Sequence, residues 1–159
     1  METFNIVAGV ASILGLFVSF LAFFQARKAS VAATAARDAV IMRTLADELE
    51  LVCARAEQLA DFLSHQRFDE ATLRVAELVS GLSEMPRRRS PYLDEGDRNS
   101  LLTSREQLQS IGDTIQEHRA NPIDPSGRNR LIRVAGRVVA SLREVSGAVK
   151  SKLEAGVAK

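Results

Sequence analysis

The chain has 159 residues, of which 46% are hydrophobic and 26% charged, and its formal net charge is +1. This composition is ordinary for a globular protein, and near-neutral charge without a base-reading motif argues against duplex nucleic acid as a partner. A single cysteine, Cys53, excludes an internal disulfide and agrees with a reducing compartment. We expect it to be a small buried hydrophobic side chain rather than a reactive thiol.

Residues 5–24 contain no charged side chain, and Arg27 and Lys28 follow them. About 20 apolar helical residues cross a bilayer, so this stretch predicts a transmembrane helix. A secretory signal peptide would carry its cations before a shorter apolar region, although the small residues Ala26 and Ala29 keep that alternative open. Because cations flank the cytoplasmic end of a span, we expect residues 1–4 outside and the C-terminus inside, as in a single-pass protein of the bacterial inner (plasma) membrane.

Small residues recur along the predicted span at spacings of three and four, which places them on one helix face. Such a face lets two helices approach closely within lipid and favours a homo-oligomer. The alternative is chance, since small residues are common in membrane helices. The predicted oligomerisation face consists of Ala8, Ala11, Ser12, Gly15, Ser19 and Ala22.

Beyond the span the sequence predicts helices alone, with residues 25–40 as a juxtamembrane stalk and residues 41–155 as a bundle. No Gly or Pro occurs from Ala26 to Gln66, so the first helix is expected to be long. Its second half carries a heptad-like apolar stripe, suited to bundle or coiled-coil packing and to self-association. This stripe comprises Ile41, Leu45, Leu49, Val52, Ala56, Leu59 and Leu63.

Three further helices are expected. The second begins after the N-cap Asp69 and ends near Leu82; residues 84–99, with two prolines and many charges, then form a loop. The third covers about 100–119 and the fourth about 128–153. Their expected apolar faces are Leu73, Ala76, Leu78 or Val79, and Leu82; then Leu101, Leu108, Ile111 and Ile115; then Leu131, Val134, Val138, Leu142, Val145 and Val149. The predicted fold is all-α: one N-terminal transmembrane helix followed by a cytoplasmic antiparallel bundle of about four helices.

The sequence contains no recognisable catalytic or cofactor motif. The histidines, His65 and His118, are isolated near predicted helix ends, where an imidazolium would meet the helix dipole; this pattern does not suggest a metal site. Phosphate-loop and dinucleotide-binding motifs are absent from the sequence. We therefore expect a protein that is not an enzyme and that needs no cofactor or metal.

Two arginine clusters are candidates for anion binding. One lies in the predicted loop and the other at the start of the last helix, where free N–H groups and the helix dipole also favour anions. Arginine forks match phosphate oxygens, so a nucleotide or polyphosphate is one expected ligand. Alternatively, the arginines are solvated or pair with acids of the chain: Asp94, Glu95 and Asp97 for the loop, and Asp47, Glu48, Glu50, Glu57 and Asp61 for the last helix. The clusters are Arg87, Arg88 and Arg89, and Arg128, Arg130, Arg133 and Arg137.

In outline the chain resembles small bacterial proteins with one N-terminal span and a helical cytoplasmic module, some of them scaffold subunits and some membrane effectors of antiphage systems. This resemblance is architectural and carries no motif. The leading expectation is a membrane-anchored interaction module that self-associates or holds a cytoplasmic protein partner at the lipid bilayer. The alternative is a membrane effector whose bundle senses an anionic or nucleotide signal and rearranges its transmembrane helices.

Overall fold

The computed structural model describes residues 2–89, 91–117 and 123–157, with side chains from residue 19 to residue 156 within these ranges. They form four α-helices and contain no strand, which confirms an all-α fold. The chain divides into two compact units, Met1–Val40 and Ile41–Lys159. The longest helix, α1 (Glu2–Ser64), contributes to both units.

The first unit is helical throughout its described residues. Its described side chains include large apolar groups that are exposed, among them Phe20, Phe23 and Phe24. The rings of Phe20 and Phe24 meet edge to face with their centroids 4.7 Å apart. Among the described residues, no helix is long and apolar enough to cross a membrane. Residues 5–18, which hold most of the predicted span, lie outside the described side chains.

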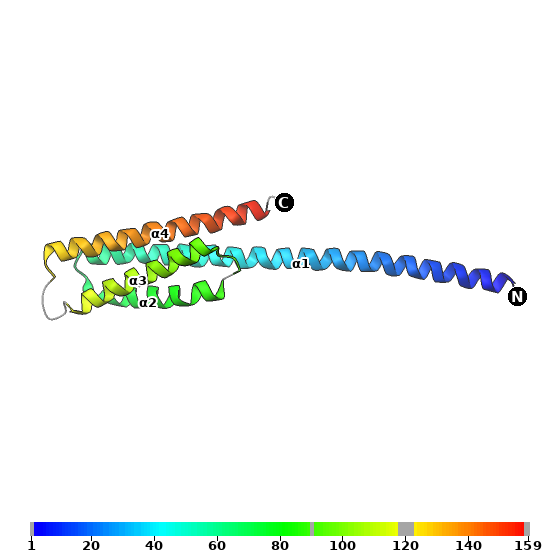
Figure 1. Cartoon of the computed structure of the whole chain (residues 1–159), viewed down its shortest axis with the longest axis horizontal. Helices are drawn as coiled ribbons and strands as arrows, with labels where there is room; N and C mark the ends of the chain where they lie inside the picture. Colours follow the sequence, from blue (N-terminus) through cyan, green and yellow to red (C-terminus); the bar gives the residue numbers. More distant parts are fainter. Residues whose placement is uncertain (1, 90, 118–122, 158–159) are drawn as a thin grey trace. The chain divides into compact units, whose positions relative to one another are not determined.

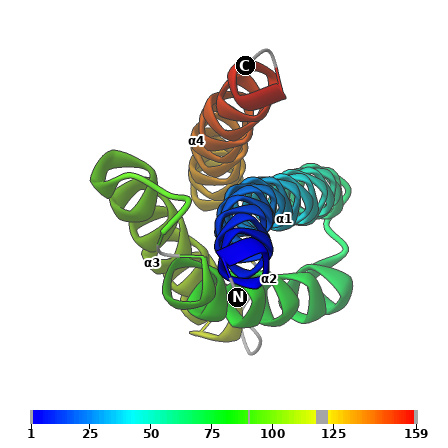
Figure 2. The ribbon, with the colours of Figure 1, turned by 90° about the vertical axis from the view of Figure 1, so that its right-hand side faces the viewer.

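The second unit is a bundle of four helices: α1 from Ile41 onward, α2 (Phe68–Arg88), α3 (Glu95–Glu117) and α4 (Pro125–Val157). The helices lie around a common core and reverse direction at each connection (Figures 1 and 2). Side-chain pairs show that α4 runs antiparallel to α1, because Arg143 pairs with Glu57 and Lys150 with Glu50. Short connections and antiparallel neighbours are typical of an up-and-down bundle.

The bundle core contains one stripe from each helix, as the apolar spacing predicts. Six of the seven predicted α1 positions are buried, and Ile41 is half-buried. The predicted face of α3 is fully buried, and on α4 only Val134 is half-buried. The α1 stripe is therefore occupied within its own chain, so our expectation that it mediates self-association is wrong for this packing.

The second helix differs from the prediction in its start and its face. It begins at Phe68 after the N-cap residue Arg67, which makes no side-chain cap, so Asp69 lies in the first turn and is not the cap. An acid there still meets the positive end of the helix dipole. Leu73 is 69% exposed and Ala76 is exposed, because the stripe that faces the core is Ala71, Val75, Leu78, Leu82 and Met85.

The loop predicted over residues 84–99 is much shorter in the structure, because most of these residues belong to helices. Helix α2 continues through Pro86 to Arg88, and α3 begins at Glu95. Pro86 removes one backbone N–H, yet Met85 beside it is buried in the core and extends the apolar stripe by one turn. Leu93 then anchors the short connection in the core. The burial of Met85 and Leu93 explains why α2 continues past Pro86.

Carboxylate caps begin the last two helices. Asp94 accepts a hydrogen bond from the backbone N–H of Asp97 at 2.8 Å, and Asp124 accepts one from that of Gly127 at 2.9 Å. These bonds satisfy N–H groups that a helix start otherwise leaves unpaired. Gly112 does not interrupt α3; it lies where a Cβ atom would come within 3.1 Å of the Val75 side chain on α2.

Candidate functional site

Helix α4 carries cations on two flanks, and the flank toward α1 is paired. Arg143 contacts Glu57 at 2.6 Å, and Lys150 contacts Glu50. Near the end of α4, Lys152 donates hydrogen bonds to both Asp94 and Asp97, at 3.0 and 2.8 Å. The bonds to these carboxylates raise the pKa of Lys152, that to Asp97 most. These ion pairs tie the C-terminal half of α4 to its neighbours.

The N-terminal half of α4 carries arginines without such partners. The second predicted cluster is Arg128, Arg130, Arg133 and Arg137. No carboxylate among the described residues lies within ion-pairing distance of any of them. Arg130, Arg133 and Arg137 are exposed and line a surface hollow of about 650 Å³. We call these three residues the arginine stripe.

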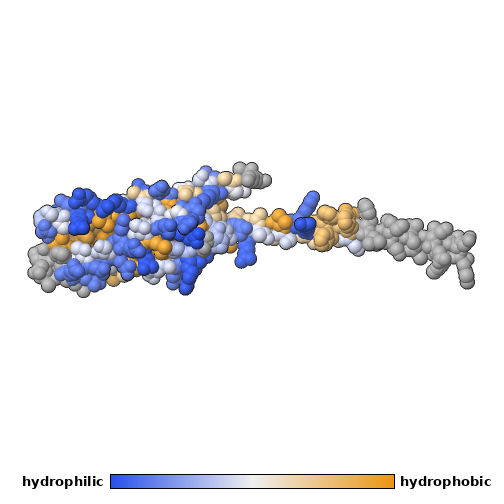
Figure 3. Space-filling model, in the orientation of Figure 1, coloured by the Kyte–Doolittle hydropathy of each residue, from blue (hydrophilic) through white to orange (hydrophobic). Residues whose placement is uncertain are grey.

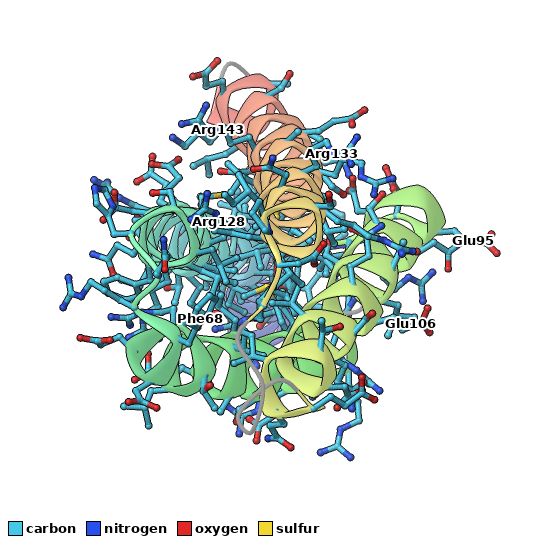
Figure 4. All side chains as sticks on the ribbon, turned by 90° about the vertical axis from the view of Figure 1, so that its left-hand side faces the viewer. Phe68, Glu95, Glu106, Arg128, Arg133 and Arg143 are labelled. Atoms are coloured by element: carbon cyan, nitrogen blue, oxygen red, sulfur yellow. The ribbon has the colours of Figure 1, made fainter. Side chains whose placement is uncertain are left out.

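Helical geometry explains why the arginine stripe finds no acid. Positions 130, 133 and 137 share a face, which lies on the other side of the helix from the paired Arg143; Figure 4 shows Arg133 and Arg143 on opposite flanks of α4. On the neighbouring α3, Ser104 faces α4, since its hydroxyl lies 3.4 Å from that of Ser141. Glu106 lies on the outer side of α3 (Figure 4). Among the described residues, no ion pair joins the stripe to α3.

Four of the five α1 acids expected to neutralise the arginine stripe have other partners. Glu48 pairs with Arg89, Glu50 with Lys150, Glu57 with Arg143, and Asp61 with His65. The expected pairing between the stripe and α1 is therefore wrong, because these acids pair with other cations. The α1 acids do hold α4, but through cations on its other flank.

The loop arginines are at the end of α2. Arg87 and Arg88 lie in its last turn, Arg88 pairs with Glu84 at 2.6 Å, and Arg89 reaches Glu48 at 2.8 Å. The predicted acids Asp94 and Asp97 instead bind Lys152.

The two arginine clusters lie toward opposite ends of the bundle. Glu48 and Glu50 are close in sequence and pair with Arg89 and Lys150, which places Arg89 near the level of Lys150. About 20 Å of α4 separates that level from Arg137, the nearest member of the stripe. A small ligand cannot touch both clusters, so the structure does not bring them together as one site.

Cys53 lies at the bottom of a groove between α1 and α4. It is 7% exposed, and the groove, of about 400 Å³, is bordered by the Glu57–Arg143 and Glu50–Lys150 pairs. Burial raises the pKa of the Cys53 thiol, and the carboxylate of Glu57 adds to this effect. A raised pKa leaves less thiolate at neutral pH, in keeping with a structural side chain.

The histidines form no site with other ligands in the described structure. His65 follows the end of α1, where its Nδ1 lies 3.2 Å from the Asp61 carboxylate. His118 lies outside the described residues. Over the part of the chain that the structure describes, no three histidine, cysteine or carboxylate side chains gather as they would around a metal ion.

The fold and these sites define a four-helix bundle with an N-terminal helical extension. No known protein family, curated protein or solved structure matches this chain.

Proposed function

We propose that the protein is a membrane-anchored, non-enzymatic interaction module, with its N-terminus outside, its bundle in the cytoplasm and residues 5–24 in the bilayer. The observation that carries this proposal is the distribution of exposed apolar side chains. Nine large hydrophobic side chains are exposed in the described part of the chain. Six of them belong to the first unit: Phe20, Leu21, Phe23, Phe24, Val31 and Val40. Apolar clusters of this kind on a surface mark contact with lipid or with another protein.

The surface of the second unit supports the same division of roles. In Figure 3 the visible face of the bundle is mostly hydrophilic, whereas the coloured part of the first unit includes hydrophobic patches. The bundle buries its own stripes, so its fold does not call for a second copy. Self-association is therefore proposed for the span, through the face that contains Gly15. Of that face, Ser19 and Ala22 are exposed, and the other four side chains lie outside the described residues.

Recovery of a differently tagged second copy from native membranes tests self-association. Gly15→Leu is expected to lower the recovery several-fold, because a bulky side chain holds the two backbones apart. Val10→Leu is the matched control, since helical geometry places position 10 on the opposite face and the change also adds bulk. Equal recovery for both variants, or none for the wild type, would contradict self-association through this face.

The alternative, a membrane effector that responds to an anion, is favoured by one observation. The arginine stripe has no carboxylate partner in the described structure, so its charge is available to a ligand. Membrane depolarisation on expression, abolished both by Arg133→Glu and by Gly15→Leu, is the result expected of an effector. A normal membrane potential on strong expression would leave the interaction module as the function.

A further inference from the structure

We infer that the arginine stripe is a binding site for a small anion with several linked phosphate groups, such as a polyphosphate or the phosphate chain of a nucleotide. The inference concerns the bundle alone and does not rest on the membrane anchor. Three exposed arginines line one hollow, and no other residue of the described ranges contributes to its lining. Each guanidinium presents N–H donors in a planar fork that matches two phosphate oxygens.

The position of the stripe on its helix adds to the positive potential. Arg130, Arg133 and Arg137 extend over about 10 Å of α4, which suits an elongated anion better than a single phosphate. Arg128 lies two residues closer to the N-terminus of α4, in its first turn, where the helix dipole is positive. In α4 the first turn contains no acidic residue, in contrast to the first turns of α2 and α3, although the Asp124 carboxylate caps the start of the helix.

Many cations elsewhere in the bundle do have carboxylate partners. Among the described residues, seven lysines and arginines are held by carboxylates: Arg67, Arg74, Arg88, Arg89, Arg143, Lys150 and Lys152. Three cations in one hollow without a carboxylate repel one another, and a polyanion relieves that repulsion. The free energy of binding therefore comes from neutralising charges that the fold leaves together.

The lining of the hollow argues for a small anion rather than a protein partner. Protein interfaces obtain most of their binding energy from buried apolar or aromatic anchors surrounded by a polar rim. Of the residues that the structure describes, only arginines line the hollow, so they offer a partner helix charge and no apolar or aromatic side chain. No aromatic side chain is among the described lining residues, so a base could stack only on a guanidinium plane, and binding of a nucleotide is expected to depend mainly on its phosphates.

Calorimetric titration of the full chain in detergent micelles with tripolyphosphate tests this site. Binding is expected at low salt and should weaken as salt is added. Arg133→Gln with Arg137→Gln is expected to lower the affinity about tenfold or more, since two charge-assisted contacts are removed. The matched control is Arg43→Gln with Arg55→Gln, which removes the same charge from α1 and should change the affinity less than about twofold.

Two further arms separate the stripe from a general positive surface. Replacing all three arginines by lysine keeps the charge but removes the forks, and is expected to weaken binding several-fold. A glutamate peptide of equal charge should bind more weakly than tripolyphosphate. The inference is overturned if the wild type does not bind tripolyphosphate, if the control variant loses as much affinity as the stripe variant, or if the peptide binds equally well. Unchanged thermal unfolding of the variants shows that the loss is not one of folding.

Discussion

The two units of this chain use apolar side chains in opposite ways. In the bundle, Leu49 and Leu142 are fully buried, and the four stripes cover one another. In the first unit, Phe20 and Phe23 are 62% and 63% exposed. Burying a large apolar side chain contributes about 1.5–3 kcal/mol, so the bundle has gained this free energy within the chain and the first unit has not. We therefore expect a protein partner or lipid to cover the exposed apolar side chains of the first unit.

The largest expected effect comes from emptying the bundle core. Leu49→Ala should lower the free energy of unfolding by about 2–5 kcal/mol, because it removes a fully buried side chain and leaves a cavity. Leu51→Ala, two residues away and 53% exposed, should change it by no more than about 0.5 kcal/mol. Chemical unfolding followed by circular dichroism measures both. Similar losses would show that the bundle is not the self-sufficient unit described.

A smaller loss is expected at the connection between α2 and α3. Lys152→Met removes the cation that contacts Asp97, which is only 8% exposed, and should cost about 1–2 kcal/mol because a mostly buried carboxylate loses its partner. Asp113→Asn, at an exposed acid near the end of α3, is the control. An equal effect of the two substitutions would remove the argument that this ion pair holds the bundle end.

The same cluster predicts an acid-side loss of stability. The pKa of Asp94 is lowered, first by the hydrogen bond from the Asp97 N–H and then by that from Lys152. A carboxyl group with a lowered pKa stabilises the fold above its unfolded-state pKa of about 4, and this contribution is lost as the pH falls through its folded-state value. Unfolding measured from pH 6 downward should therefore show a smaller acid-induced loss in Asp94→Asn than in the wild type. Parallel pH profiles would contradict this assignment.

A gain in stability is expected at the turn between α1 and α2. Gln66 has a φ of 59°, and the N–H of Arg67 bonds to the carbonyl of Phe62 at 2.8 Å, as in a helix end closed by a left-handed residue. Gln66→Gly should stabilise the bundle by about 1 kcal/mol, since glycine adopts this conformation without strain. Gln109→Gly, within α3, should destabilise it by about 0.5–1 kcal/mol. A loss at both positions in thermal unfolding would refute the turn assignment.

The smallest effect is expected from the ion pairs between α1 and α4. The Glu57–Arg143 pair is largely exposed, and exposed pairs contribute about 0.2–1 kcal/mol. A double-mutant cycle with Glu57→Gln and Arg143→Gln should give a coupling energy within that range. A coupling energy of several kcal/mol would mean that these pairs, and not the apolar stripes, hold α4 in place.

Apolar periodicity predicted the fold well wherever one helix face is unambiguous. On α3 and α4 the spacing of leucines and valines marks the core. It failed on α2, because Leu73 and Val79 compete with Val75 and Leu78 for the inward face, and only packing against Gly112 and its neighbours decides between them. Local rules likewise ended α2 at its proline-containing segment, whereas burial of Met85 carries the helix further.

The sequence predicted which residues form the candidate site, but not which acids lie near them. Sequence spacing placed Arg130, Arg133 and Arg137 on one face, and the structure places them in one hollow. Which acids they face depends on the register and rotation of α4 against α1 and α3, and neither is encoded in local spacing. The cations that do meet the α1 acids, Arg143 and Lys150, had no distinguishing local signal. Antiparallel pairing of the two helices was the signal that could have identified them.

Extraction of the membrane fraction at alkaline pH tests the central claim, that residues 5–24 anchor the bundle in a bilayer. The full chain is expected to stay in the membrane pellet. Leu14→Arg with Val18→Arg should release it to the supernatant, since each cation near the centre of a span costs about 2.5–3.5 kcal/mol. Placing the two arginines on the bundle surface, at Leu73 and Leu102, should leave it in the pellet. Release of the unaltered chain to the supernatant would contradict the account.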